Sequence, residues 1–362
     1  MGGAAWASAR RILCVRLDSM GDVLMTTPAI RALREAGPGR HIALLTSASG
    51  AEAAALVPEI DGVVEYDPPW MKHTPQRGGP APDLAMVERL RDGRFDAAVI
   101  FTVYSQNPLP AAMLCYLADI PLRLAHCHEN PYQLLTHWVP DPEPAAGIRH
   151  EVQRQLDLVA SVGATDSDDR LSIAVPAAAR RAALQAVLEA AIDRERPWVV
   201  LHPGATAPSR RYPPDLFAEV LRGLAAFGVQ VVVTGSAAER QLAETVIGLS
   251  GASAANLAGE LSLPGLAALI QLAPVLVSNN SGPVHIAAAV GTPVVDIYAL
   301  TNPQHTPWQV ENRLLTHDVP CRNCLRSVCP EGHHNCLRLI PPAAVAEAAL
   351  ELLRARAREL LP

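Results

Sequence analysis

The segment Ile12-Leu-Cys-Val-Arg-Leu-Asp-Ser-Met-Gly-Asp22 decides the fold class. Its apolar start predicts a buried strand over Ile12–Leu17, and its polar end predicts a loop that leads into a helix from about Val23. The second half repeats this arrangement, because the strand-like run Trp198–His202 is also followed by a polar loop and a helical pattern. Strands that alternate with helices in this way predict parallel sheets covered by helices on both faces.

The same alternation extends outward from both segments. Further strands are predicted at His41–Thr46, Val63–Tyr66, Ala97–Phe101, Val229–Thr234, Val275–Ser278 and Pro293–Tyr298. Helices are predicted at Pro28–Glu35, Leu84–Asp92, Leu216–Phe227, Ala237–Leu249, Gly265–Leu272 and Pro283–Val290. We therefore predict an α/β chain of two doubly wound, Rossmann-like domains, residues 1–174 and 175–345, that face each other across a cleft. A terminal helix in residues 346–362 follows, and its packing back on the first domain is an open alternative.

Composition narrows the class of protein. The 362 residues are 49% hydrophobic but only 4% aromatic, which is typical of helices packed on parallel sheets. A net charge of −6 gives no reason to expect a nucleic-acid partner. No apolar core precedes Arg10, and the longest stretch without Asp, Glu, Lys or Arg, Leu261–Val295, contains four prolines. We expect a cytoplasmic protein with reduced cysteines and at most peripheral membrane contact.

The first post-strand loop, Asp18-Ser-Met-Gly-Asp22, places two carboxylates where ligands bind open parallel sheets, at the carboxyl end of a strand. Gly21 permits a tight turn, and Asp22 falls at the expected N-cap of the following helix. A purely capping role for Asp22 is one interpretation. The other is that its carboxylate is a general base for a hydroxyl group, with Asp18 as the competing candidate.

Two post-strand loops of the second half suit a diphosphate. His202-Pro-Gly-Ala-Thr206 supplies a glycine and a hydroxyl group, and Arg210 with Arg211 supplies positive charge for phosphate oxygens. Asn279-Asn-Ser-Gly-Pro-Val-His285 opens a second helix, whose first N–H groups favour an anion. The chain contains neither a Walker motif nor a G-x-G-x-x-G motif, which counts against an NTPase or a dinucleotide dehydrogenase.

Taken together, Ser19-Met-Gly-Asp22, His202-Pro-Gly-Ala, Arg210-Arg-Tyr-Pro and Asn280-Ser-Gly-Pro-Val-His285 resemble the lipopolysaccharide heptosyltransferases of glycosyltransferase family 9. The matches run in order from the first strand to about Trp308. The resemblance implies a GT-B fold, an ADP-heptose donor held mainly by the second domain, and metal-independent inversion at the anomeric carbon.

The resemblance also implies roles for individual residues. Asp22 falls on the general base, and Ser19 and Gly21 lie in the loop on the acceptor side. The implied donor-binding residues are Thr206, Arg210, Glu239, Leu261, Asn280, Ser281, Gly282 and His285. Asn280 departs from the family, which has an aspartate here that touches the sugar hydroxyls, so the identity of the sugar stays open. His305 lies in a polar loop near the expected sugar end.

The expected reaction is a single displacement with no cofactor and no catalytic metal. Asp166-Ser-Asp168 matches a metal-binding D-x-D only formally, because it lies at the expected domain boundary. Four cysteines, Cys321, Cys324, Cys329 and Cys336, leave structural zinc, reduced thiols and a disulfide open. The acceptor is a glycan, a glycolipid or a small molecule. The alternatives are a transferase for another nucleotide sugar and a non-catalytic protein that binds a sugar nucleotide.

Overall fold

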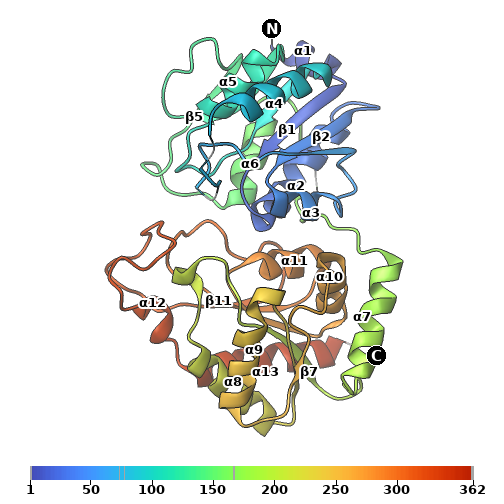
Figure 1. The fold of residues 1–362 in the computed structure, drawn as a ribbon, viewed down its shortest axis with the longest axis vertical. Helices are drawn as coiled ribbons and strands as arrows, with labels where there is room; N and C mark the ends of the chain where they lie inside the picture. Colours follow the sequence, from blue (N-terminus) through green and yellow to red (C-terminus); the bar gives the residue numbers. More distant parts are fainter. Residues whose placement is uncertain (1, 73, 77, 166–167, 360–362) are drawn as a thin grey trace. The chain divides into compact units, whose positions relative to one another are not determined.

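The computed structural model describes residues 2–72, 74–76, 78–165 and 168–359, so Asp166 lies outside the described residues. The chain divides into two compact units, residues 1–172 and 173–362 (Figure 1). Each unit contains one six-stranded parallel sheet with helices packed on it, as the strand and helix alternation predicts. The observed boundary lies two residues before the predicted one.

The first unit contains a sheet with strand order β3-β2-β1-β4-β5-β6. Its strands are β1 (Arg11–Arg16), β2 (His41–Thr46), β3 (Gly62–Glu65), β4 (Ala97–Ile100), β5 (Leu122–Cys127) and β6 (His137–Pro140). Its helices are α1 (Gly2–Ser8), α2 (Met20–Glu35), α3 (Ala48–Ala54), α4 (Ala81–Asp92), α5 (Leu109–Leu117) and α6 (Glu151–Ala160). The strand order reverses between the neighbours β1 and β4, so this unit has a topological switch point there.

The second unit repeats this topology with strand order β12-β11-β10-β7-β8-β9. Its strands are β7 (Trp198–His202), β8 (Gln230–Val233), β9 (Ala255–Asn256), β10 (Leu276–Asn279), β11 (Val294–Ile297) and β12 (Asn312–Leu315). Its helices are α7 (Ala177–Glu189), α8 (Pro214–Ala226), α9 (Arg240–Ser250), α10 (Leu263–Leu272), α11 (Gly282–Val290), α12 (Asn335–Arg338) and α13 (Pro342–Glu359), with short 3₁₀ turns at Pro208–Arg210 and Ala237–Glu239. Its switch point lies between β7 and β10.

The central strands are buried on both faces, which explains their continuous apolar runs. β1 is buried from Ile12 to Arg16, and all of β7 is buried. Helices supply the other half of each core through Ala, Val and Leu side chains, such as Leu90 of α4 and Leu224 of α8. These small aliphatic side chains let helices lie close to the sheets, and they account for the low aromatic content.

The terminal helix α13 belongs to the core of the second unit. Val345, Ala349 and Leu352 are fully buried in the same apolar cluster as Phe217 of α8. Helix α13 packs on α8 and β11 of the same unit. Among the described residues, no helix combines the length and apolar character needed to cross a bilayer.

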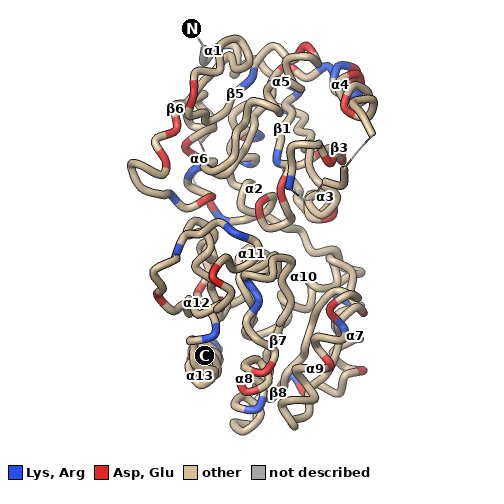
Figure 2. The backbone as a smooth tube through the Cα atoms, turned by 60° about the vertical axis from the view of Figure 1, so that its left-hand side comes forward, with Lys and Arg blue, Asp and Glu red and all other residues tan. Residues whose placement is uncertain are grey.

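Charged residues are interspersed along both units (Figure 2). Helix α4 is an example, because it carries Asp83 and Glu88 together with Arg89 and Arg91. Such mixed surfaces are ordinary for a protein with a small net negative charge.

Candidate active site

Polar side chains gather at the first switch point. Asp18 lies in the loop after β1 and Asp22 in the first turn of α2, and the loop after the neighbouring β4 carries Gln106, whose amide donates to Asp18 Oδ1. Ligands of open α/β sheets bind outside the carboxyl ends of strands at such a point. The structure therefore places both candidate bases of the sequence analysis at the expected position.

Asp22 lies one turn further into its helix than the sequence indicated. Helix α2 begins at Met20 with Ser19 as its N-cap, so Gly21 is a buried residue of the first turn and Asp22 is the N3 residue. The carboxylate of Asp22 accepts hydrogen bonds from the backbone N–H of Ser19 at 3.1 Å and from its hydroxyl at 2.7 Å. Asp22 therefore does cap the helix, but as the N3 residue of a capping box and not as the N-cap residue that the sequence indicated.

Arg16 pairs with the carboxylates of both Asp18 and Asp22. Its guanidinium is fully buried and lies 3.1 Å from Asp18 Oδ2, 3.1 Å from Asp22 Oδ1 and 2.7 Å from Glu151 Oε1. Three carboxylates around one guanidinium leave an excess of negative charge. Burial raises the pKa of Asp18 to about 6, and the charge of Asp22 adds to the rise while Arg16 opposes it. The cluster can therefore take up a proton near neutral pH.

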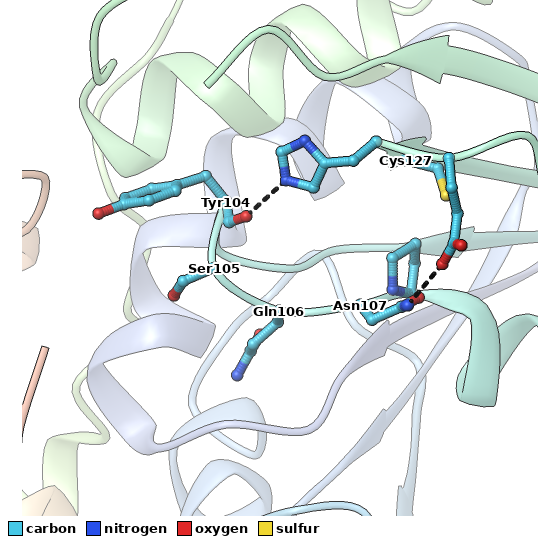
Figure 3. A pocket seen from close by; sticks show the side chains of 8 residues that line it. Tyr104, Ser105, Gln106, Asn107 and Cys127 are labelled. Atoms are coloured by element: carbon cyan, nitrogen blue, oxygen red, sulfur yellow. Dashed lines mark hydrogen bonds between the residues drawn. The ribbon is translucent and has the colours of Figure 1, made fainter. Parts of the chain in front are cut away.

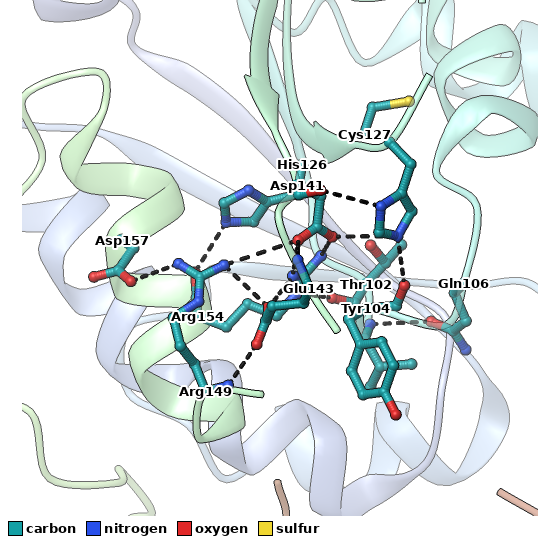
Figure 4. Close-up of polar contacts among 12 residues, drawn as sticks. Thr102, Tyr104, Gln106, His126, Cys127, Asp141, Glu143, Arg149, Arg154 and Asp157 are labelled. Carbon is teal, nitrogen blue, oxygen red and sulfur yellow. Dashed lines mark hydrogen bonds and ion pairs between the residues drawn. The ribbon is translucent and has the colours of Figure 1, made fainter. Parts of the chain in front are cut away.

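Helix α6 connects this cluster to the ends of other strands. Gln155 donates to Glu151 and to the carbonyl of Thr102, which follows β4. Arg154 also donates to Thr102 O and pairs at 2.6 Å with Asp141, which follows β6 (Figure 4). Because these groups are buried and hydrogen-bonded, they fix the loops around the switch point.

The second switch point brings together the two anion-suited loops of the sequence analysis. Asn279, the last residue of β10, donates to the carbonyl of Pro203 at 2.7 Å and accepts from the N–H of Tyr212 at 2.9 Å. One side chain thus holds both ends of the loop after β7 against the start of α11. His202 contacts Thr234 Oγ1 at 3.0 Å, and burial lowers the pKa of this imidazole.

The two arginines of this loop differ. Arg211 is exposed, but its guanidinium donates to the carbonyls of Ala205 and Thr206 and so supports the loop itself. Arg210 is half-buried and donates to Asn302 Oδ1 at 3.0 Å. Of the two, Arg210 is the one whose charge is directed toward the polar residues beyond β11.

Asn280 lies at the centre of those polar residues. Its side chain is buried, and its amide donates to Asp296 Oδ2 at 3.0 Å and to the carbonyl of His305 at 2.9 Å. Burial raises the pKa of Asp296 to about 7, whereas Asn280 and Arg210 oppose the rise. Because both amide hydrogens of Asn280 point to protein oxygens, only its oxygen remains for a sugar hydroxyl. His305 is buried and contacts Asn302 at 2.8 Å.

The remaining predicted donor residues lie on loops that follow strands of the same sheet. Glu239 accepts from the N–H of Ser236, and a Cβ at Gly204 would lie 2.2 Å from its carboxylate, so this acid lies directly over Gly204. Thr206 is exposed, and Leu261 is half-buried just before α10. Ser281 is the N-cap of α11, Gly282 is its first residue and His285 is buried in its first turn.

The four clustered cysteines, Cys321, Cys324, Cys329 and Cys336, are free, half-buried thiols in the second unit. Cys321 Sγ is 4.0 Å from His333 Nε2, and burial together with the neighbouring thiols raises the pKa of Cys336. Within the described part of the chain, no three His, Cys, Asp or Glu side chains are grouped to hold a metal ion.

Four residues of these sites were missed from the sequence: Arg16, Gln106, Glu151 and Asp296. Arg16 and Asp296 are charged residues inside the apolar runs of β1 and β11, which is a signal that each requires a buried partner. Glu151 gave no such signal, because it lies 135 residues from Arg16 in the chain.

The comparisons with known proteins agree with this arrangement. The two Rossmann-like units have the GT-B fold, as the similar solved structures of glycosyltransferases show. The chain belongs to glycosyltransferase family 9, the heptosyltransferase family, whose sequence model matches residues 84–335.

Relatives and solved structures cover nearly the whole chain. The sequence is 26% identical over 353 residues to lipopolysaccharide heptosyltransferase 2 of Escherichia coli K12, covering 95% of this chain and 98% of that protein. The fold is similar to a family 9 glycosyltransferase from Veillonella parvula, with a TM-score of 0.77 and 22% identity over 96% and 97% of the two chains. It is also similar to the ADP-heptose lipopolysaccharide heptosyltransferase II of E. coli, with a TM-score of 0.74 and 24% identity over 96% and 99%.

Proposed function

We propose that this glycosyltransferase moves a heptose from ADP-heptose to an acceptor hydroxyl in lipopolysaccharide or a related glycan, with inversion and without a metal. The observation that carries the proposal is the position of Asp22. Its carboxylate lies at the switch point of the first unit, is oriented by Ser19 and Arg16, and keeps a partly exposed side chain. A fixed, partly exposed carboxylate at a ligand-binding edge suits a general base.

In the proposed reaction, Asp22 takes the proton of the acceptor hydroxyl as the oxygen attacks the anomeric carbon of the donor. The bond to the nucleotide diphosphate breaks in the same step, so the attack from the opposite side inverts the configuration. Arg16 keeps Asp22 in orientation, and the nearby charges of Asp18 and Glu151 keep the arginine from neutralising the base completely.

The second unit is proposed to bind the donor. Arg210 and the first N–H groups of α11 supply positive charge for the diphosphate, which carries the developing charge as it leaves. The Glu239 carboxylate lies over Gly204, where it suits the hydroxyls of a nucleoside and not the diphosphate. Arg210 and the start of α11 provide the electrostatic help that a metal ion supplies in other transferases.

Two rival functions remain and can be separated. A different nucleotide sugar is favoured if Asn280, with both amide hydrogens used by Asp296 and His305, fails to accommodate heptose. A non-catalytic protein that binds a sugar nucleotide would not require the Asp22 carboxylate, because the donor is assigned to the second unit. A panel of nucleotide sugars distinguishes these functions from the proposed one.

We expect EDTA-treated protein to transfer heptose from ADP-heptose to truncated lipopolysaccharide cores at most of its untreated rate. The physical reason is that Arg210 and the start of α11 stabilise the leaving group. The measurement is the initial rate, followed by mass spectrometry of the acceptor, with ADP-glucose and UDP-glucose as control donors. A large loss that Mg²⁺ or Mn²⁺ restores would overturn the metal-free mechanism, and equal transfer from a control donor would overturn the heptose assignment.

A further inference from the structure

A pocket of about 270 Å³ lies at the carboxyl ends of β4 and β5 in the first unit (Figure 3). Its lining residues come from the loop after β4, the last residue of β5 and the loop after β5: Tyr104, Ser105, Gln106, Asn107, Pro108, Cys127, His128 and Glu129. This is the sheet edge at which an open α/β fold binds ligands, and only Gln106 among the lining residues also belongs to the candidate active site described above.

Gln106 connects the pocket to the candidate catalytic cluster. It lines the pocket, and its amide donates to Asp18 Oδ1 while Asp18 also pairs with Arg16. Because Arg16 contacts Asp22 as well, only one guanidinium separates the Gln106–Asp18 pair from the proposed base. A ligand in this pocket would therefore lie in the same unit as Asp22, the proposed base, and beside the loop that carries Asp18.

The chemistry of the lining suits a sugar ring. Ser105, Gln106 and Asn107 offer neutral hydrogen-bonding groups, and Glu129 adds a carboxylate, which accepts hydrogen bonds from hydroxyl groups. The lining contains no lysine or arginine, and a carboxylate in the wall repels an anion, so a phosphate is disfavoured. The volume lies just below the usual ~300–1,000 Å³ of pockets for drug-sized ligands, which fits a single sugar unit.

The walls of the pocket are held in place. Asn107 donates to Glu129 Oε1 at 2.9 Å and accepts from the N–H of Leu109 at the start of α5 (Figure 3). His128 contacts the carbonyl of Tyr104 at 2.8 Å and that of Asp141 at 3.2 Å, which ties the loops after β4, β5 and β6 together (Figure 4). A pre-formed wall lowers the entropy cost of binding a polar ligand.

We propose that this pocket binds an uncharged sugar ring of the acceptor through hydrogen bonds from its hydroxyls to Asn107 and Glu129. This inference rests on the proposed function. Gln106 forms the wall nearest the carboxylates. The pocket then selects acceptors by the hydroxyl pattern of that ring, whereas Asp22 acts on the attacking hydroxyl.

The test uses Asn107→Asp and Glu129→Gln in the full-length protein. Asn107→Asp keeps the bond to Leu109 N–H but loses two donor hydrogens, and Glu129→Gln removes a charge at constant shape. A hydrogen bond to a charged group contributes about 1.5–3 kcal/mol of binding free energy, and about 1.4 kcal/mol corresponds to a tenfold change in affinity. We therefore expect KM for a truncated lipopolysaccharide core to rise about tenfold or more, with a smaller change in kcat. ADP affinity, measured by calorimetry, is expected to stay at the parent value.

Asn130→Asp is the matched control, because it adds the same charge as Asn107→Asp, lies next to Glu129 in the loop after β5, keeps its bond to Tyr132 N–H and does not line the pocket. A KM within twofold of the parent for both pocket variants, or an equal rise in the control, would overturn the proposal.

A second measurement separates this proposal from the proposed function. Saturation-transfer NMR with the deacylated core oligosaccharide reports binding without turnover. Weaker signals in both pocket variants than in the parent and in Asn130→Asp support the pocket even if no sugar is transferred, in which case the proposed function fails alone. Equal signals in all four proteins would refute the pocket, whatever the transfer rate.

Discussion

Replacing Asp22 with asparagine is expected to lower kcat by about 10²–10⁴, which is the usual contribution of a general base. Asparagine keeps the shape of the side chain, and its amide oxygen can still accept from the Ser19 N–H, but it cannot take up the acceptor proton. The measurement is kcat with saturating donor and acceptor, together with ADP affinity, which we expect to remain unchanged because the donor is assigned to the second unit.

Stability separates a catalytic role from a capping role. The variant loses the contact with the Arg16 guanidinium but retains a capping residue, so we expect a loss of about 1–2 kcal/mol in the free energy of unfolding. A role confined to capping predicts a comparable stability loss with nearly normal turnover. Melting temperature and kcat therefore need to be measured on the same samples.

Asp18→Asn is the matched control, because Asp18 has the same two kinds of partner, an arginine and an amide donor. If Asp22 is the base, this variant should lose less than about tenfold in kcat, since only positioning is affected. Near-normal turnover by Asp22→Asn, or a collapse confined to Asp18→Asn, would contradict the assignment.

Reversing the charge of Arg210, as Arg210→Glu, is expected to weaken ADP binding by more than about 100-fold. A charge-assisted hydrogen bond to phosphate contributes about 1.5–3 kcal/mol, and the substitution both removes it and places a carboxylate beside the diphosphate. The new carboxylate would also lie near Asp296, whose pKa is already raised by burial, and the favourable charge of Arg210 beside it would be lost. Isothermal titration calorimetry with ADP measures the effect.

Arg211→Glu is the control for this prediction. Its guanidinium donates to the carbonyls of Ala205 and Thr206, so the variant disturbs the loop and changes the net charge by the same amount. Affinity for ADP should fall much less in Arg211→Glu than in Arg210→Glu. Equal losses would mean that overall charge, and not a contact of Arg210, controls binding.

The sequence was sufficient to predict the fold because local patterns agree with it. β2 and β7 match the predicted ranges, since a buried parallel strand needs a continuous apolar run that ends abruptly in polar residues. Strands β5, β6, β9 and β12 were missed. β6, β9 and β12 lie at sheet edges, and half of the positions of β6 are exposed. β5 is an interior strand, but Arg123 and His126 interrupt its apolar run. The start of α2 was placed too late because Met20 and Gly21 gave no helical signal by themselves.

The site was predictable where it follows the chain locally and unpredictable where it depends on packing. Asp22, Arg210 and Ser281 each follow a recognisable strand, so their loops were found. The pairing of Arg16 with Glu151 and the contact of Gln106 with Asp18 join segments 135 and 88 residues apart. The order of strands in the sheet and the packing of α6 on α2 bring these segments together, and a single sequence specifies neither.

The most direct test of the central claim, a single displacement on ADP-heptose, is the anomeric configuration of the product. The parent enzyme is incubated with ADP-heptose and a truncated lipopolysaccharide core, and the new glycosidic linkage is analysed by NMR against the configuration of the donor. A single attack assisted by one base predicts a product with the anomeric configuration inverted. A product that retains the donor's configuration, or an acceptor that gains no heptose, would contradict it.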